Sequence, residues 1–480
     1  MSSPQARRPL LTEGPIAKTL LLFALPILGS TVLQSLNASV NAMWIGHYLG
    51  ESALTATSNA TLILFLLLSA VFGVSMACTI LVGQSLGARN VLEAKRVVGT
   101  SAGFFLAISI TIAALSYLFT PALLRAMGTP ADALPYAVPY LRIIFLALPS
   151  MYFYNFMMMT LRGAGDSRTP FMFMGLSVVL DVALNPILIF GLGPFPKMGI
   201  AGSATATLIA QSVALFALLG TLYARKYFLR ITRAELKLLL PDTTILRALI
   251  FKGLPMGLQM IVISSSAILM MRLVNSYGSQ TTAAYGAATQ LWNYVQMPAM
   301  AIGAAVSSMA AQNVGARLWD RVGRIAVTGV GYNFLLSGTL VALVYLFNQP
   351  ALNLFLPGDS VGLHLAEHLN AIVVWSFVFF GVTFVIFGVV RSTGAVWAPL
   401  IILTITMWLV RPPFALSLMS SMGADAIWWS FPLGSLLSML LAMAYYRWGG
   451  WKQAHMLVQP SKTGMLPKVP TQPAPVSIGE

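Results

Sequence analysis

Long apolar stretches separated by short polar ones run through almost the whole chain. A helix needs about 20 apolar residues to cross the hydrocarbon core of a membrane, and twelve stretches of roughly that length or more contain no Lys or Arg and a single acid, Asp181. These stretches are residues 19–46, 52–88, 97–124, 143–161, 169–196, 198–224, 253–271, 273–316, 325–358, 368–390, 392–410 and 426–446. We predict one membrane-spanning helix in each, and hence an all-α integral membrane protein.

The composition of the 480-residue chain agrees with this pattern. Hydrophobic residues make up 58% of the chain and charged residues only 9%, whereas about 25% of the residues in an ordinary soluble domain are charged. No polar block is long enough for a separate soluble domain, and no cleavable signal is evident, because the first apolar stretch is long enough to span. The lipid bilayer is therefore the expected surrounding of the whole chain.

The basic residues predict the orientation of the helices. If the N-terminus lies inside the cell, twelve spans place 23 of the 28 Lys and Arg residues on the cytoplasmic side, and only Arg125 and Lys197 fall in outside loops. Three more, Arg142, Arg272 and Arg411, fall within spans or at their ends. Basic residues favour the cytoplasmic side, so both termini are predicted to be cytoplasmic, in a plasma membrane. The same bias accounts for the net charge of +15, and nucleic acid is not expected as a partner.

The two halves of the chain repeat each other at an offset of 228–229 residues. Three pairs of motifs match in the same order: ALP at 24–26 with GLP at 253–255, GQSLGAR at 83–89 with AQNVGAR at 311–317, and RGAG at 162–165 with RSTG at 391–394. The offset contains six predicted spans, so the halves have parallel orientation and are expected to lie about an axis along the membrane normal, with a substrate path between them. Such an arrangement is typical of a transporter.

The repeat divides the chain into five parts. An N-terminal cytoplasmic tail, residues 1–15, precedes a first lobe of six spans, residues 16–225. A linker, residues 226–245, mixes basic residues with leucines and is expected to lie along the cytoplasmic interface. The second lobe follows at residues 246–450, and the tail 451–480, rich in Pro, Ser, Thr and Lys, is predicted to be disordered.

The candidate chemistry lies in residues 180–191, LDVALNPILIFG, where one acid stands deep inside an apolar stretch. Burial in an apolar medium disfavours the ionised form of a carboxyl group, so Asp181 is predicted to take up a proton on one side of the membrane and release it on the other. Asn185, one turn on, can donate to the anion or accept from the acid, and Pro186 frees a carbonyl near residue 182 and favours a helix bend. Two other roles remain open for Asp181: a structural pair with Arg411, whose segment is the repeat counterpart, or direct cation binding.

The order and spacing of these motifs resemble the multidrug and toxic compound extrusion (MATE) family. The resemblance extends over residues 15–450 and includes LRGAGDSRTP at 161–170, LNPILIFG at 184–191 and LVRPP at 409–413. It implies twelve helices in two six-helix lobes related by a pseudo-two-fold axis along the membrane normal, in a bacterial inner membrane. It also implies a secondary antiporter that exports bulky, often cationic amphiphiles in exchange for inward protons or sodium ions.

The chain departs from the family pattern at its polar positions. Family members commonly carry an aspartate in the first helix, where this chain has Asn41, and their fifth helix often shows an asparagine followed one turn later by an aspartate. Here Asp181 precedes Asn185, and the acids that some members carry in helices seven and ten are missing. We therefore expect Asp181 to carry most of the proton coupling, beside Asn41 and Asn37. A sodium-coupled exporter and a flippase for lipid-linked precursors are the alternatives.

Polar and adaptable side chains within spans are the candidates for a substrate cavity. The run YFYNFMMM at 152–159 offers methionines, which adapt to varied apolar shapes, and aromatic rings, which accept cations on their faces. Such a run can equally face lipid or pack within the protein, and isolated amides can equally bond a neighbouring helix. The candidate lining residues are Asn155, Tyr152, Met158, Gln34, Gln259, Asn293 and Arg411.

Other kinds of chemistry find little support in the sequence. The glycine-rich loops lack the Lys-Ser/Thr pair that opens a helix in a phosphate-binding loop, which argues against direct use of ATP. The four histidines stand apart, so no metal site is predicted, and no cofactor is expected. An integral-membrane enzyme would need clustered acids, histidines or cysteines inside the spans, where Asp181 stands alone. The expected protein is a monomeric transporter of small molecules and not an enzyme.

Overall fold

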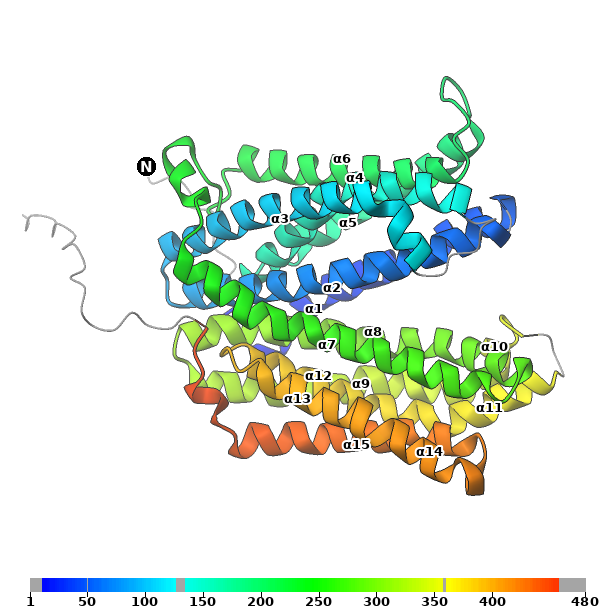
Figure 1. Ribbon diagram of the computed structural model, residues 1–480. Coiled ribbons are helices and arrows are strands. Elements are labelled where there is room, and N and C mark those ends of the chain that lie inside the picture. The colour runs from blue at the N-terminus through cyan, green and yellow to red at the C-terminus, as the bar shows by residue number, and fades with distance from the viewer. Residues whose placement is uncertain (1–10, 50, 127–133, 357–359, 457–480) are drawn as a thin grey trace, which may run out of the picture.

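Helices build both lobes of the protein, as Figure 1 shows. The computed structural model describes residues 11–49, 51–126, 134–356 and 360–456. The first lobe consists of α1 (Ile16–Leu49), α2 (Glu51–Gly87), α3 (Val91–Ala126), α4 (Leu134–Gly163), α5 (Arg168–Phe190) and α6 (Ile200–Ala224). The second consists of α7 (Thr243–Asn275), α8 (Ser279–Gly315), α9 (Trp319–Leu346), α10 (Asn348–Leu352), α11 (Val361–Val373), α12 (Phe377–Arg391), α13 (Trp397–Thr404), α14 (Arg411–Met422) and α15 (Asp425–Trp448).

The described helices form twelve rods, one for each predicted span. A 3-10 turn, η2 (Val374–Ser376), joins α11 and α12 into one rod, and a π-helical segment, η3 (Ile405–Val410), joins α13 and α14 into another. Eleven described stretches are long and apolar enough to cross a membrane. The twelfth rod, α8, has 37 residues but carries many Ser, Thr, Asn and Gln side chains. Helix α8 packs against helices of both lobes, and these contacts separate many of its polar groups from lipid.

The predicted end of the eleventh span was wrong because the buried Arg411 was taken for the end of the span. The eleventh rod runs from residue 397 to 422 and not from 392 to 410. Arg411 lies within it, with its guanidinium 3.9 Å above the ring of Phe431, which stabilises the charge inside the lobe. Pro412 and Pro413 follow Arg411 and have no backbone N–H to donate, so the hydrogen-bond ladder shifts to the π-helical pattern just before them.

The internal repeat is confirmed by the helices themselves. Both α2 and α8 have 37 residues, and their first and last residues are 228 positions apart. The rods that follow keep the same order in each half, with α4 matching the rod of α11 and α12, and α5 matching the rod of α13 and α14. The predicted fold class, two lobes of six spans each in parallel orientation, is therefore confirmed.

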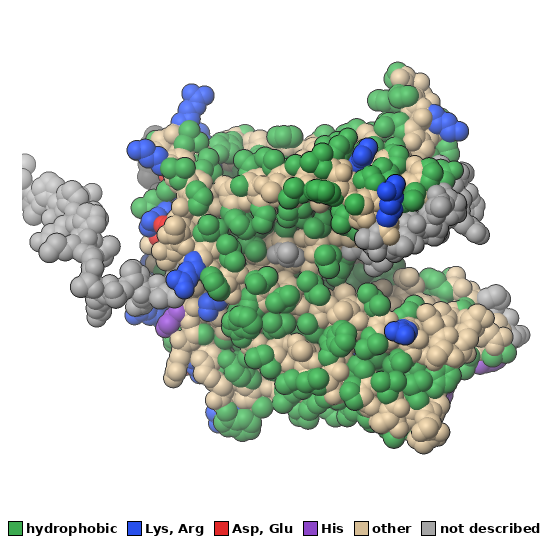
Figure 2. Space-filling view, viewed as in Figure 1, with side chains coloured by type: hydrophobic (Ala, Val, Ile, Leu, Met, Phe, Trp, Pro, Cys, Tyr) green, Lys and Arg blue, Asp and Glu red, His purple; other side chains and the backbone are tan. Residues whose placement is uncertain are grey.

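Both lobes meet closely at the end of the molecule where α2, α4, α6 and α8 finish. We call this the basic end, because Lys and Arg side chains gather there (Figure 2). A Cβ atom on Gly73 of α2 would clash with the backbone of Gly253 and Gly257 in α7. Glycine is therefore required at residue 73 for the lobes to approach this closely. Toward the opposite end, which we call the far end, Figure 2 shows the surface hollowed between the lobes.

Two glutamines, one from each repeated motif, connect the lobes at the basic end. Gln84 donates through Nε2 to the carbonyl oxygen of Ser392 at 2.6 Å, and Gln312 donates through Nε2 to that of Gly163 at 3.0 Å. Gly163 is the last residue of α4 and Ser392 directly follows α12, so both acceptors lie at a helix C-terminus, where carbonyls lack partners within the helix. The donors are 228 residues apart and the acceptors 229, so the two bonds are equivalent under the internal repeat. The motifs predicted only as turns therefore also connect the lobes.

Parts of both predicted tails pack on this interface. Leu11 is buried, donates its N–H to Oε1 of Gln312 at 2.8 Å and accepts from Asn313 at 3.2 Å. Trp451, in the 3-10 turn η4 (Gly450–Gln453), is also buried, and its carbonyl accepts from the hydroxyl of Thr393 at 2.7 Å. The prediction of a disordered tail from residue 451 onward was wrong for residues 451–456, because they cover the loop after α12. Residues 457–480 lie outside the described residues.

The linker between the lobes is attached to α3. Its 3-10 helix η1 (Arg233–Leu239) lies against Gly99 and Gly103 of α3, and Lys95 contacts Glu235 at 2.8 Å. Hydrogen bonds from Lys95 and from the backbone of Thr232 lower the pKa of Glu235 to about 2. The carboxylate therefore stays ionised at neutral pH, and the linker is held to the first lobe.

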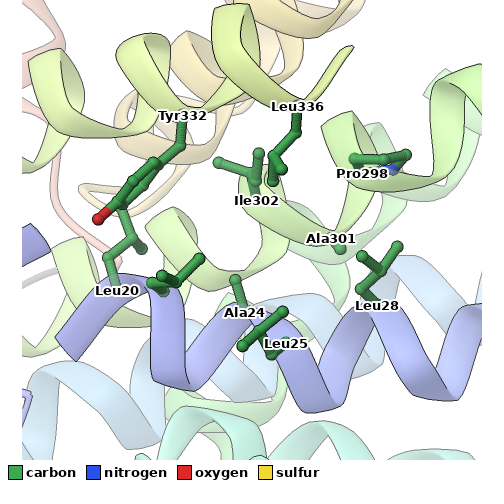
Figure 3. A pocket seen from close by; sticks show the side chains of 10 residues that line it. Leu20, Ala24, Leu25, Leu28, Pro298, Ala301, Ile302, Tyr332 and Leu336 are labelled. Atoms are coloured by element: carbon green, nitrogen blue, oxygen red, sulfur yellow. The ribbon is translucent and has the colours of Figure 1, made fainter. Parts of the chain in front are cut away.

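A crevice between α1 and the second lobe is filled by apolar side chains (Figure 3). Ala24 and Leu28 of α1 face Ala301 and Ile302 of α8, and all of the lining is apolar. The free volume is only about 10 Å³, roughly what one water molecule needs. The crevice is therefore a packing contact between the lobes and not a binding site.

We predict that Gly73→Ala destabilises the protein by about 1–3 kcal/mol, as overpacking does in other tightly packed interiors. The added methyl would meet backbone atoms of α7, which cannot move aside as a flexible side chain can. Thermal unfolding of the purified protein in one detergent measures the effect. Gly220→Ala in α6 is the control, because a Cβ there meets nothing within 4 Å; equal melting temperatures for the two variants would contradict the prediction.

Candidate functional site

Asp181 lies inside the first lobe, where α1, α5 and α6 meet. Its side chain is 2% exposed. Oδ2 accepts from Nδ2 of Asn37 and from Nδ2 of Asn41, both at 2.8 Å, and Oδ1 accepts from Oγ1 of Thr207 at 3.1 Å. Three donors from two other helices thus surround one carboxylate, an arrangement that stabilises the ionised form.

Asn185 belongs to the same cluster but does not touch the carboxylate. Its Nδ2 donates to Oδ1 of Asn41 at 2.9 Å and to the backbone oxygen of Asp181 at 2.8 Å. The predicted direct bond between Asn185 and the acid was therefore wrong, because this amide is bonded to its own helix one turn back and to Asn41. Helix α5 continues through Pro186 as far as Phe190, and the predicted bend at Pro186 stays a prediction.

Two amide oxygens in the cluster have no donor among the described residues. They are Oδ1 of Asn37 and Oδ1 of Asn185, and both are buried. An unsatisfied buried acceptor costs free energy, so each is open to a proton donor. This matters for the chemistry, because a protonated Asp181 would itself be a donor.

The structural pair between Asp181 and Arg411 is contradicted. Within the described residues, Nη1 of Arg411 contacts the sulfur of Met407 at 3.6 Å, and its guanidinium stacks on Phe431 in the second lobe. The hydrogen-bond partners of the Asp181 carboxylate are the neutral side chains described above. Repeat-related segments need not touch, because the lobes lie side by side and each buries its fifth rod separately.

A chamber of about 400 Å³ lies between the lobes, lined by α1, α2, α4 and α5 of the first and by α7 and α8 of the second. Its volume is within the usual range for a small-molecule site, about 300–1,000 Å³. Three of the predicted lining residues are there: Gln34, Asn155 and Met158. The structure brings these three together from α1 and α4.

Four other predicted lining residues lie elsewhere. Tyr152 is buried and donates its hydroxyl to the carbonyl of Leu67 at 3.2 Å. Gln259 is 3% exposed and bonds within the second lobe, Asn293 lies exposed on α8, and Arg411 lies against Phe431. The periodicity of a membrane helix does not say which face meets a cavity, because packing faces and cavity faces are equally apolar.

Arg162 is the cavity residue that the sequence analysis missed. It lies in the last turn of α4 and lines the chamber on the side of the basic end. In the sequence it was counted as a loop charge that favours the cytoplasmic side. Its position 229 residues before Arg391, in a motif repeated in both halves, was the signal that could have distinguished it from an ordinary loop charge.

The chamber and the carboxylate cluster share one face of α1. Thr31 and Gln34 line the chamber, and Asn37 and Asn41 continue the same face at helical spacing toward the far end. Pro26 lies inside the same helix and removes one hydrogen bond from its ladder, which allows a bend there. A change at Asp181 can therefore reach the chamber through a single helix.

A multi-pass membrane chain with two repeated lobes, a chamber between them and one buried carboxylate beside it defines a membrane transporter. The comparisons with known proteins agree. A family model described as MatE matches residues 26–187 and 255–416, one segment in each lobe. The chain belongs to this family, the multidrug and toxic compound extrusion (MATE) efflux transporters.

Relatives and solved structures extend over nearly the whole chain. The chain is 37% identical over 454 residues to the probable multidrug resistance protein YoeA of Bacillus subtilis (strain 168), with 93% of this chain and 98% of that protein covered. It is 31% identical to the probable multidrug resistance protein YpnP of the same organism, with 93% and 98% covered. The crystal structure of MATE in complex with MaL6 superimposes with a TM-score of 0.87 at 20% identity, over 94% of this chain and 100% of that one. The last similarity shows a shared fold.

We predict that Thr207→Val lowers the stability of the protein by about 1–3 kcal/mol, because one oxygen of a buried carboxylate loses its donor. Valine keeps nearly the same shape, so the packing is little changed. Thr205→Val is the matched control, since that hydroxyl bonds only the carbonyl of Ala201 in its own helix. Chemical unfolding of both variants at neutral pH measures the difference; a control as destabilised as Thr207→Val would count against the bond.

Proposed function

We propose that this protein exports bulky amphiphilic small molecules and is driven by inward proton flux through Asp181. The observation that carries the proposal is the set of three donors on one buried carboxylate in the first lobe. Hydrogen bonds to an ionised acceptor are roughly twice as strong as those between neutral groups. Protonation of Asp181 therefore weakens its hold on α1, and α1 also lines the chamber.

The cluster can satisfy both protonation states of the acid. The ionised carboxylate accepts from Asn37, Asn41 and Thr207. A protonated carboxyl group needs an acceptor for its O–H, and the unsatisfied Oδ1 of Asn37 becomes one if its amide turns over. A proton can thus be held and released without leaving a buried charge unpaired.

The same contacts favour a proton over a sodium ion as the coupling ion. Sodium needs several oxygen ligands around it, and the described groups that face the carboxylate present N–H and O–H donors instead. The two unsatisfied amide oxygens, on Asn37 and Asn185, are the sodium ligands that this cluster could still offer. Sodium coupling is therefore the second candidate, and the experiment below includes it.

Alternating access would expose the chamber to each side in turn. The closed basic end, with its close glycine contacts and two inter-lobe glutamine bonds, corresponds to the cytoplasmic side in the orientation that the basic residues favour. The hollow at the far end then faces the outside of a bacterial inner membrane, with both termini cytoplasmic. A flippase for lipid-linked precursors is the weaker alternative. One cation in a chamber of about 400 Å³ provides too little positive charge to bind a diphosphate.

We predict that Asp181→Asn abolishes proton-driven efflux, because an amide cannot take up and release a proton at this site. Purified protein in liposomes, loaded with a bulky fluorescent amphiphile and given an inward proton gradient, reports the transport. Asp320→Asn is the control, since this exposed acid lies at the start of α9, at the basic end.

Three outcomes would overturn the proposal. Proton-driven efflux that persists in Asp181→Asn would place the coupling elsewhere. Efflux driven by a sodium gradient at constant pH, and lost in the same variant, would make sodium the coupling ion. Binding of a lipid-linked precursor without efflux of small amphiphiles would favour the flippase.

A further inference from the structure

We propose that the chamber selects amphiphiles that carry an anionic head group, and that Arg162 binds this group at the basic end of the chamber. The inference rests on the proposed function only in that it names the class of compound that the exporter carries. It does not depend on which ion drives transport. The head group is an oxyanion such as a carboxylate, a sulfonate or a phosphate, because the planar guanidinium pairs with such groups through two N–H donors.

Among the described residues, Arg162 has no anionic partner. It is the only charged residue among those that line the chamber, and its Nε is buried without a hydrogen-bond partner among the described residues. The ion pairs found in the described residues all involve other side chains. A half-buried cation that lines a cavity and has no partner among the described residues is the arrangement expected where a ligand supplies the counter-charge.

Arg391, the repeat counterpart of Arg162, shows how an arginine at this position can be hydrogen-bonded within the protein. In the second lobe, Nε of Arg391 donates to the carbonyl of Phe387 at 3.1 Å, and its Nη1 reaches Oε1 of Gln259 at 3.4 Å. The residue of α1 that corresponds to Gln259, counted from Pro26 and Pro255, is Ser30.

The serine is too short to repeat that bond. Ser30 instead donates to the carbonyl of Pro26 in its own helix at 2.9 Å, and it lines the chamber. The shorter side chain leaves Arg162 without its expected partner and leaves open the space that a glutamine would occupy. One substitution between the repeats thus both creates room for a ligand and leaves a cation facing it.

No described carboxylate is available to a cationic ligand in the chamber. The lining contains no acid, and Asp181 of α5, which bonds the same face of α1, is 2% exposed and accepts from Asn37, Asn41 and Thr207. The C-terminus of α4 carries about half a negative charge, which reduces the field of Arg162 but does not reverse it. One carbonyl at that end, of Gly163, is also occupied by Gln312.

The rest of the chamber suits a large apolar body. Six methionines line it: Met76, Met158, Met159, Met174, Met260 and Met300. Methionine side chains are flexible and polarisable, so they accommodate varied shapes. The expected ligand therefore has a bulky hydrocarbon or aromatic part among the methionines and one anionic group at Arg162.

Three probes that share one apolar body test the proposal: pyrenebutyrate, pyrenebutanol and pyrenebutyl-trimethylammonium. Binding is measured without any ion gradient, to the full-length protein in phosphatidylcholine nanodiscs, with empty nanodiscs subtracted. We expect the wild-type protein to bind the anion at least about ten-fold more tightly than the cation, the effect usual for one buried charge pair. We expect Arg162→Gln to remove most of that preference, while Arg162→Lys keeps it in part because the positive charge remains.

Ser30→Gln provides an independent test that leaves Arg162 in place. The glutamine would supply the partner that Gln259 gives Arg391 and would fill part of the chamber, so anion binding should fall while the variant stays folded. Asp425→Asn is the control for a general effect of charge, because this acid lies at the far end, where it contacts His368 at 3.0 Å. Asp181→Asn should keep the preference for the anion even where it loses efflux, which separates this proposal from proton coupling.

The result that overturns the proposal is a wild-type preference for the cation. An anion preference that both Arg162→Gln and Ser30→Gln leave unchanged would overturn it as well. If Arg162→Gln does not fold, the anion-to-cation ratio of Ser30→Gln decides alone. In Asp181→Asn, loss of proton-driven efflux together with an intact anion preference would support both proposals.

Discussion

Stabilising one carboxylate in an apolar lobe is the constraint on which the arrangement of the first lobe depends. A charged aspartate at the centre of a bilayer costs about 2.5–3.5 kcal/mol on insertion scales, and this cost falls only where donors reach the carboxylate. Asn37 and Asn41 come from α1, and Thr207 comes from α6. Helices α1, α5 and α6 must therefore meet at this depth, and α1 is placed with one face along the chamber.

The two lobes share their backbone packing but not their chemistry. Features of the scaffold occur in both halves. Examples are the inter-lobe bonds of Gln84 and Gln312 and the equal lengths of α2 and α8. The acid inside the first lobe does not repeat. Position 410, the counterpart of Asp181, is a valine. The proposed mechanism needs only one carboxylate, so the second lobe is free to satisfy its own polar groups internally.

The sequence predicted the features that depend on composition and order along the chain. Twelve rods, the parallel repeat and the isolation of Asp181 all follow from where charges are missing, because a bilayer excludes charge over a fixed thickness. The same rule failed where a charge lies inside the protein. Arg411 was taken for the end of a span and Arg162 for a loop charge, although one stacks on Phe431 and the other lines a chamber.

The sequence by itself therefore determined the number and order of the helices, their apolar character, and the presence of one acid that the membrane disfavours. Only the tertiary structure decided which side chains meet. It placed Asn41 rather than Asn185 on the carboxylate and left Tyr152 out of the chamber. The physical reason is that membrane helices are apolar on every face, so periodicity does not distinguish a packed face from one that lines a cavity. That distinction depends on contacts between residues far apart in the chain.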